Sequence, residues 1–292
     1  RSKKYKAIFE SYSSGSAQSQ LPIHALKEIP IIFPSFSEQR AIAGVLSSLD
    51  DKIELLCEQN KTLEATAQAI FKEWFVNFNF PGATGKMIDS ELGEIPEGWR
   101  VEKITNILDF IKGSEPGAAN YTNEKADNDY VPFYRVQDIS QYGNIPNIYV
   151  EEKLLRGKIF NHDDILVSLD GTIGRVFIGG AGGHSGGIRR VVGKHDFIKK
   201  SLILCFLKSP KFQSDLESFS GAETTIKHAS GAIEHIRFVL QDDICKKFGV
   251  AFDPLFQKIV SNISQVQILS KLRDALMPKL MKGEVRVKEF DK

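Results

Sequence analysis

Residues 37–74 read SEQRAIAGVLSSLDDKIELLCEQNKTLEATAQAIFKEW, and the spacing of their apolar residues decides the fold. Apolar positions recur at alternating steps of three and four, with Asn60 filling the one gap: Ile42, Val45/Leu46, Leu49, Ile53, Leu56, Leu63, Ala67, Ile70 and Trp74. A seam of this period predicts a helix over about residues 37–77 that buries one face against another helix. Ser35 and Glu38 form an S-x-x-E capping box, which predicts the helix N-terminus. Such a helix spans roughly 60 Å.

An internal repeat at an offset of about 206 residues supplies the second helix. Ser14-Gly15 through Ile29–Phe33 match Ser220-Gly221 through Ile236–Leu240, and each copy leads into a helical segment. The first seam then maps onto a second one, comprising Phe248, Phe252, Leu255, Ile259, Leu269, Leu276 and Leu280. Each seam carries one Asn, Asn60 in the first and Asn262 in the second, displaced by four residues in the repeat. A buried Asn in a seam fixes the register of a helix pair.

Two matching seams are buried most simply against each other. Because about 160 residues of other structure separate them, we expect an antiparallel pair; the alternative is that each seam packs on its own globular domain. Asp253-Pro254 predicts a break in the second helix, with Pro254 restarting it at a first-turn position. Met277-Pro278 and Gly283 predict its end.

The middle of the chain, about residues 85–240, has a different pattern. Short β-rich runs alternate with turns, at Tyr130–Val136, Ile145–Val150, Asp164–Ser168, Thr172–Ile178, Ile188–Val192 and Ile236–Leu240. Two helices are expected, over Phe197–Phe206 and Pro210–Phe219. The glycine-dense Gly179–Gly187 lacks the phosphate-loop pattern G-x-x-x-x-G-K-S/T, so a mobile turn is the better interpretation.

The predicted fold class is therefore α+β, a globular domain inserted between two long helices that pair as an antiparallel coiled coil. Four parts are expected: 1–34, 35–80, 81–241 and 242–292, of which the second is the first long helix and the last is the second helix with a tail. Residues 1–34 match the end of the inserted domain, so we interpret them as the tail of a preceding domain of the same kind. The chain then corresponds to the second half of a longer two-domain protein plus the end of its first half, or to a half-length protein.

Composition and motifs favour a soluble, non-catalytic protein. Apolar residues make up 42% and charged residues 26%, and the formal net charge of +1 means that any basic surface must be local. No apolar run of about 18 residues and no signal peptide are present, and the three scattered cysteines suit a reducing cytoplasm. The six histidines are also scattered; His162-Asp163-Asp164 has no second cluster to complete a metal site and is interpreted as a turn. No G-x-S-x-G or Asn-Pro-Pro-aromatic motif occurs, so no cofactor is expected.

Four stretches resemble the specificity subunits of type I restriction–modification systems. They are Pro34-x-x-x-Glu38-Gln39 at a helix start, Leu92–Trp99 (LGEIPEGW), Asp164–Ser168 followed by Gly171–Arg175, and Leu272–Leu280 followed by Gly283-Glu284. In that family the second stretch opens a target recognition domain, the third is its central strand–turn–strand and the fourth is the closing helix. The stretches occur in the family's order and cover nearly the whole chain.

The resemblance implies a non-catalytic subunit that reads double-stranded DNA. In the family, two recognition domains each read half of a split site, and two helices hold them apart and bind methyltransferase subunits. The restriction subunit is a separate chain and an indirect partner. This chain contains one complete recognition domain rather than two, which leaves three alternatives: it acts alone, it self-associates as a half-subunit, or it acts only as part of a longer chain. The alternatives are a coiled-coil scaffold that binds no DNA and, less favoured, a stand-alone enzyme.

The candidate DNA-contacting residues are basic or hydrogen-bonding side chains in the expected loops of residues 81–241. They are Lys112, Lys125, Arg135, Gln137, Thr172, Arg175, His184, Arg189, Arg190, Thr225, Lys227 and His228. Arg and Gln can pair with guanine and adenine edges, and cations with phosphates. Arg189 and Arg190 alternate along a strand, so one at most faces a given surface. For any single residue, an unpartnered surface charge is the competing interpretation.

An aromatic cluster near the end of the first helix is the candidate partner-binding site. Its members are Phe71, Trp74 and Phe75. Exposed aromatic side chains on a helix are common protein contacts, so the cluster could dock a methyltransferase subunit. The alternative is that it packs under the recognition domain or against the second helix.

Overall fold

The computed structural model describes residues 3–13, 20–30, 34–125, 127–220 and 227–287, apart from the side chains of residues 3–5 and 227–228. The repeat residues Ile31–Phe33 and the candidate Thr225 lie outside the described residues. Inter-residue contacts divide the chain into two units, Arg1–Glu54 with Ile268–Lys292, and Leu55–Gln267. Both long helices contribute to both units.

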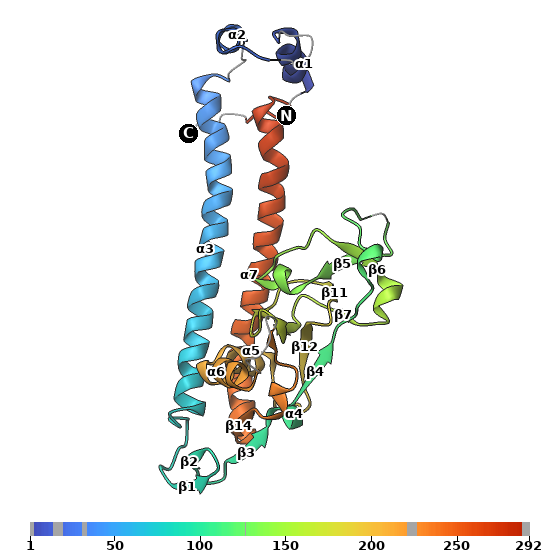
Figure 1. The fold of residues 1–292 in the computed structure, drawn as a ribbon. Coiled ribbons are helices and arrows are strands. Elements are labelled where there is room, and N and C mark those ends of the chain that lie inside the picture. The colour runs from blue at the N-terminus through green and yellow to red at the C-terminus, as the bar shows by residue number, and fades with distance from the viewer. Residues whose placement is uncertain (1–2, 14–19, 31–33, 126, 221–226, 288–292) are drawn as a thin grey trace. The chain divides into compact units, whose positions relative to one another are not determined.

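The two long helices are antiparallel, as the seams predict (Figure 1). Helix α3 runs over Phe36–Phe75 and α7 over Asp242–Met281. In the smaller unit Asp50 of α3 pairs with Arg273 of α7 at 2.9 Å. In the larger unit the rings of Phe75 and Phe248 lie 5.5 Å apart. Residue numbers rise along one helix as their partners fall along the other, so the predicted pairing of the seams is confirmed.

The two seam asparagines, displaced in the repeat, meet each other in the structure. The side-chain amide of Asn262 donates to Oδ1 of Asn60 at 2.9 Å and to Oε1 of Gln59 at 3.3 Å. Nδ2 of Asn60 lies 3.4 Å from the carbonyl oxygen of Ile259, to which it donates. Both asparagines are buried. Because sliding one helix would leave these amides unpaired among apolar side chains, the pair specifies the register of α3 against α7.

The helix ends follow local chemistry, but the predicted break at Pro254 is wrong. The backbone N–H of Glu38 donates to Oγ of Ser35 at 3.2 Å, which caps the start of α3. Gly283, with a φ of 69°, ends α7 as expected. Helix α7 nevertheless continues through Pro254. A mid-helix proline costs about 3 kcal/mol, and the buried Phe256 and Ile259 that follow it outweigh this cost by keeping the seam intact.

Residues between the long helices form two four-stranded sheets in the larger unit. One has the order β10-β8-β12-β4 and is antiparallel; the other has the order β6-β5-β11-β7, in which β5 and β11 are parallel. Their bounds are β4 Leu108–Lys112, β5 Tyr130–Tyr134, β6 Tyr149–Glu151, β7 Ile159–Phe160, β8 Ile165–Ser168, β10 Val176–Phe177, β11 Gly182–His184 and β12 Ile188–Gly193. A separate pair joins β14 (Arg237–Leu240) to β3 (Arg100–Lys103).

Shorter elements connect these sheets and complete the smaller unit. The larger unit also contains β1 Met87–Ser90, β2 Gly93–Pro96, α4 Ile104–Ile107, η1 Ala118–Asn120, η2 Val136–Ile139, η3 Glu152–Leu155, β9 Asp170–Gly171, β13 Lys227–His228 and η4 Ala232–Glu234. The smaller unit contains α1 (Lys3–Ser11) and α2 (Ile23–Glu28). The repeat offset aligns the sequence of α1 with that of α6 (Pro210–Phe219), and both segments are helical. No described helix is both long enough and apolar enough to cross a membrane.

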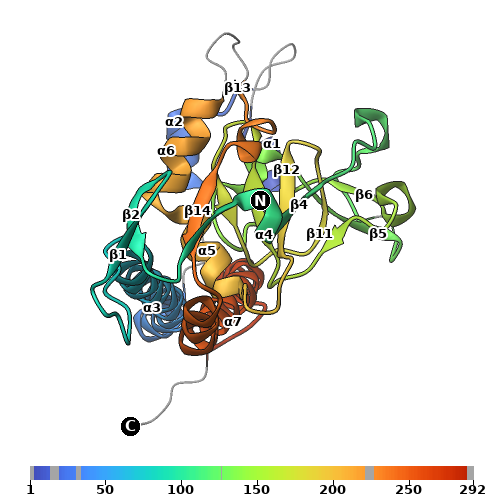
Figure 2. The same ribbon diagram turned by 90° about the horizontal axis from the view of Figure 1, so that it is seen from below.

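Helix α5 (Lys200–Lys208) joins the sheets to the helix pair within the larger unit (Figure 2). Its residues Ser201–Leu207 are all buried, so every side of this helix faces protein. Oδ1 of Asp253 in α7 accepts the backbone N–H of Ser201 at 3.0 Å and so caps the start of α5. Oγ of Ser209 accepts the N–H of Phe212 and caps α6. Both helices predicted for this region are present.

The glycine-rich segment Gly179–Gly187 contains the buried strand β11, Gly182–His184, which corrects the prediction of a mobile turn. Strand β11 pairs with β5 on one side and β7 on the other. A Cβ on Gly182 would come within 2.2 Å of the carbonyl oxygen of Pro132, and one on Gly183 within 2.5 Å of the Leu155 side chain. The glycines therefore allow close packing of backbones rather than mobility. The predicted strands at 130–136, 164–168, 188–192 and 236–240 are present, whereas those at 145–150 and 172–178 are shorter.

Candidate nucleic-acid interface

Five chain segments that are distant in sequence converge at one place in the larger unit. We call them the loop cluster; it comprises residues 112–115, 135–138, 168–175, 185–189 and 227–230. The turn at Gly186 receives the carboxylate of Glu115, whose Oε1 accepts the Gly186 N–H at 2.7 Å. The N–H of Ser114 donates to the carbonyl oxygen of His184 at 2.9 Å. These bonds join the end of β4 to the turn between β11 and β12.

The remaining segments of the loop cluster are joined by backbone contacts. Strand β9 pairs with β13, placing Gly171 opposite Lys227. The N–H groups of Leu169 and Asp170 both donate to the carbonyl oxygen of Gly187, at 2.9 and 3.2 Å. Nη1 of Arg175 donates to the carbonyl oxygen of Val136 at 3.0 Å, which ties η2 to the same place. The loop cluster is therefore a set of turns fixed by hydrogen bonds to backbone N–H and carbonyl groups.

Among the described side chains of the loop cluster, three predicted DNA-contacting residues are exposed: Lys112, Gln137 and Thr172. Lys112 ends β4, Gln137 lies on η2, and Thr172 follows β9. Together they offer an ammonium group, an amide and a hydroxyl. These groups are suited to phosphate contact and to hydrogen bonding with base edges.

Arg135 and Arg175 belong to the loop cluster but are half-buried. The guanidinium of Arg135 pairs with Asp138, with Nε 3.0 Å from Oδ2, and the same carboxylate accepts the Arg135 backbone N–H. Arg175 holds η2 through its bond to Val136. Both arginines therefore fix η2, the element that carries Gln137.

His184 and Arg189 are buried, which argues against the direct DNA contacts predicted for them. His184 is 1% exposed and lies against Phe160, with the ring centroids 5.9 Å apart. Arg189 is 6% exposed; it donates to the carbonyl oxygen of Gly186 and, at 2.6 Å, to Oγ of Ser230. Burial lowers the pKa of the Arg189 guanidinium, while Asp170 opposes this shift. The sequence marks Arg189 as a surface cation, whereas the structure uses it to brace the turns from inside.

The other predicted residues either lie apart from the loop cluster or have side chains outside the described residues. Arg190 points to the opposite face of β12 from Arg189, as strand alternation predicts, and pairs with Asp164 at 3.4 Å. Lys125 is exposed in the loop before β5, and no described contact joins it to the loop cluster. Lys227 and His228 lie on β13, within the loop cluster, but their side chains are outside the described residues.

Sequence reasoning missed two basic residues beside the loop cluster. Lys158 is exposed and its Nζ lies 3.3 Å from the carbonyl oxygen of Gly113, the neighbour of Lys112. Arg156 is also exposed and takes a left-handed backbone conformation, with a φ of 51°. The signal available in the sequence was the pair of cations around Gly157, Arg-Gly-Lys, which is typical of an exposed basic turn.

The aromatic cluster on α3 is mainly a packing element. The ring of Phe71 lies 5.0 Å from that of Phe75 and 6.0 Å from that of Phe248, and Trp74 lies 5.7 Å from Phe248. Phe71 and Phe75 are buried. They also line an apolar groove of about 580 Å³, formed by α3, the start of α6 and β14. Within the described residues, no group of three or more His, Cys, Asp or Glu side chains is placed to hold a metal ion.

The larger unit thus combines two four-stranded sheets, an antiparallel helix pair and a polar loop cluster. The family model described as the type I restriction modification DNA specificity domain matches residues 2–65 and 96–240. The chain belongs to this family.

Similar proteins agree with this assignment. The type I restriction enzyme MjaIX specificity subunit of Methanocaldococcus jannaschii is 32% identical over 99% of this chain and 68% of its own length. The putative MjaX specificity subunit of the same organism is 29% identical over 98% and 66%. The type I restriction–modification S subunit from M. genitalium has a similar fold, with a TM-score of 0.54 and 18% identity over 95% of this chain and 70% of that one. This chain therefore spans about two thirds of the length of these relatives.

Proposed function

We propose that this chain is a non-catalytic DNA-reading component of a type I restriction–modification complex, in which residues 81–241 read one half of a split target. The observation that carries this proposal is the loop cluster, because Lys112, Gln137 and Thr172 are exposed on turns that hydrogen bonds to backbone groups hold in place. Lys112 and Lys158 would contact phosphates, and Gln137 the edge of a base. Membership of the DNA specificity domain family supports the same conclusion.

The helix pair gives this function a physical basis. Reading two half-sites at a fixed gap requires a stiff spacer, since a flexible linker would let the distance between them vary. The forty residues of α3 span about 60 Å. Half-sites one turn of DNA apart are about 34 Å from each other. We infer that α3 and α7 set the gap, with the other half-site read by a second recognition domain or a second copy of the chain.

The partners of the chain in this proposal are double-stranded DNA, methyltransferase subunits and, indirectly, a restriction subunit, all in the cytoplasm. Burial of Phe71 and Phe75 means that a partner subunit would touch the rim of their groove rather than the ring faces. Ala69, Lys72 and Val76 are exposed on that rim. We therefore propose that a methyltransferase subunit docks beside the aromatic cluster, while the rings hold the helix end together.

DNA binding that weakens steeply with salt is the expected result for the purified chain. Fluorescence anisotropy with a pool of duplexes of random sequence, between about 50 and 200 mM salt, measures it, because each phosphate contact contributes to the slope. Lys112→Ala should weaken binding to all duplexes and reduce the slope by about one.

Gln137→Ala should weaken the binding free energy by about 1–3 kcal/mol, equivalent to about 5- to 150-fold in affinity, for duplexes that the wild-type chain selects from the pool. Its effect on the other duplexes should be small.

Lys258→Ala is the matched control, because this exposed lysine lies on α7 outside the loop cluster. Binding that shows no change with salt would favour a scaffold that carries no DNA-reading surface. Transfer of a labelled methyl group from S-adenosylmethionine to DNA by the chain alone would instead refute the non-catalytic assignment.

A further inference from the structure

One side chain of α7 holds two loops of the inserted domain at once. Nε2 of Gln267 donates to the carbonyl oxygens of Gly143 and Gly179, at 2.7 and 2.8 Å. Gly143 follows η2, and Gly179 follows β10. The two loops are also joined to each other, because the N–H of Gly143 donates to the carbonyl oxygen of Ile178 at 3.0 Å. Gln267 thus uses both amide hydrogens on one pair of linked loops.

The approach of α7 to these loops requires glycine at both positions. Gly143 and Gly179 have φ values of 68° and 86°, which strain any other residue. A Cβ at Gly143 would come within 2.5 Å of Cγ2 of Ile263, and one at Gly179 within 2.4 Å of the same atom. Ile263 is 4% exposed and lies one helical turn before Gln267. Backbone and helix are therefore in direct contact, with little room for the loops to shift.

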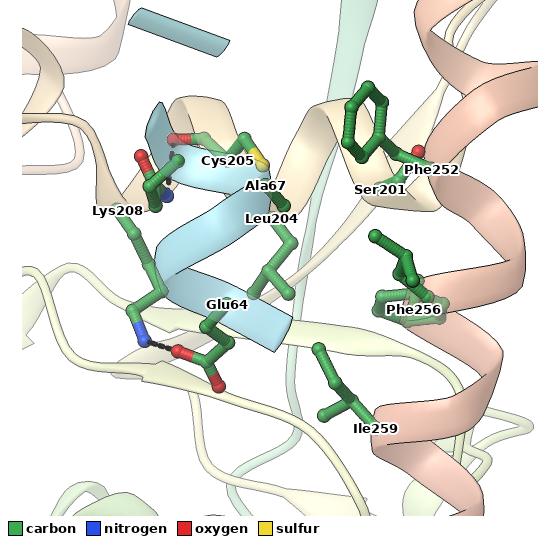
Figure 3. A pocket seen from close by; sticks show the side chains of 11 residues that line it. Glu64, Ala67, Ser201, Leu204, Cys205, Lys208, Phe252, Phe256 and Ile259 are labelled. Atoms are coloured by element: carbon green, nitrogen blue, oxygen red, sulfur yellow. Dashed lines mark hydrogen bonds and ion pairs between the residues drawn. The ribbon is translucent and has the colours of Figure 1, made fainter. Parts of the chain in front are cut away.

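The first long helix holds the same loop from another direction. Nζ of Lys208 on α5 lies 3.1 Å from the hydroxyl of Tyr142 and 5.0 Å from the centre of its ring. The same ammonium group pairs with Glu64 of α3 (Figure 3). Because Tyr142 precedes Gly143, α3 and α7 both reach one short stretch of the inserted domain.

This stretch leads directly into the loop cluster. Element η2, which carries Gln137, ends at Ile139, a buried residue. Nδ2 of Asn144 donates to the carbonyl oxygen of Asp138 at 2.7 Å, which folds the loop back onto η2. Asp138 in turn pairs with Arg135. A continuous path of short contacts therefore connects Gln267 on α7 to the segment proposed to read DNA.

We propose that Gln267 is a positioning residue that fixes the orientation of η2 and the loop cluster on the helix pair, and thereby sets the gap between half-sites. This inference rests on the proposed function. The spacer can define a gap only if the reading surface does not pivot on it. The two donated hydrogen bonds and the glycine contacts with Ile263 resist such a pivot. The sequence of the half-site, read by the loop cluster itself, does not depend on Gln267.

The test compares gap selectivity in methylated DNA. The full chain is expressed with its methyltransferase subunit in a host that lacks adenine methylation, and the methylated sites of the host DNA are mapped by long-read sequencing. Gln267→Met keeps the length of the side chain but removes both donors. We expect methylation at half-sites one base pair closer or farther to rise by about tenfold relative to the native gap, with the half-site sequences unchanged.

Gln265→Met is the matched control, because this exposed residue lies on the same helix and its amide faces Ser261 of that helix. Gln267→Lys keeps donor hydrogens and should retain a single gap. Urea unfolding establishes which variants fold. If Gln267→Met does not fold, Tyr142→Phe removes the hydroxyl that accepts from Lys208 and should likewise raise methylation at half-sites one base pair closer or farther.

The outcomes distinguish failure of the positioning role from failure of the proposed function. A folded Gln267→Met chain that methylates only sites with the native gap would overturn the positioning role. So would an equal rise in methylation at other gaps for Gln267→Lys, or such a rise for the Gln265→Met control. A wild-type chain that yields no split motif would overturn the proposed function itself.

Discussion

Replacing Phe248 by alanine should lower the free energy of unfolding by about 3–5 kcal/mol, the range for removing a buried aromatic ring. Phe248 is 0% exposed and packs between α3 and α7. Its ring lies 5.7 Å from Trp74, 5.5 Å from Phe75 and 4.4 Å from Phe252. Urea unfolding monitored by tryptophan fluorescence measures the loss, since Trp74 is a direct neighbour.

Phe219→Ala is the matched control, because Phe219 is 48% exposed at the end of α6. Phe219→Ala should lower the free energy of unfolding much less. Phe248→Leu should recover most of the stability that Phe248→Ala loses, because the leucine side chain refills most of the cavity. A Phe248→Ala chain that loses under about 1 kcal/mol would show that the aromatic contacts do not hold the helix ends together.

Acidification should destabilise the chain through His184. Burial lowers the pKa of His184 from 6.5 to about 4. Between these values the unfolded chain binds a proton at this position and the folded chain does not, so the free energy of unfolding falls as the pH falls. The stabilising effect of the neutral ring is complete above pH 6.5 and is lost toward pH 4, by about 3 kcal/mol in total.

The measurement is the unfolding free energy from pH 7 to pH 4.5 for the wild type and His184→Asn. The unfolding free energy of His184→Asn should depend less on pH than that of the wild type. The dependence should be unchanged in His195→Asn, at an exposed position. Proton NMR of the wild-type imidazole provides a second measurement that needs no variant. A His184 resonance that titrates near pH 6.5 would contradict the assigned burial.

The helix pair could be predicted because its information is local and repeated. The seam from Ile42 to Trp74 states the period of the helix, and the repeat supplies a matching partner. The antiparallel order followed from the length of the chain between the seams. The meeting of Asn60 with Asn262 could not be predicted, because the register of two helices depends on their packing and not on the repeat offset.

Pro254 and the glycine-rich segment were misjudged for the same physical reason. Local propensity describes the cost of a proline in a helix or a glycine in a strand, but not the burial gained around it. The neighbours that make Gly182 and Gly183 necessary, Pro132 and Leu155, lie distant in sequence. Tertiary contacts therefore reverse the local preference at both places.

The candidate site was predictable as residue types but not as a surface. Strand alternation correctly separated Arg189 from Arg190, yet it could not say which side faces the interior. Lys112, Gln137 and Thr172 come from three segments that only the folded domain brings together. Lys158 was missed because nothing local links it to Lys112.

Comparing the adenine methylome of the source organism with that of a strain lacking this chain is the most direct test of the central claim, that a fixed helix pair carries a DNA-reading domain. We expect a methylated motif of two short half-sites at one constant gap, present in the parent and absent from the deletion strain. Identical methylomes, or loss of an uninterrupted motif only, would contradict it.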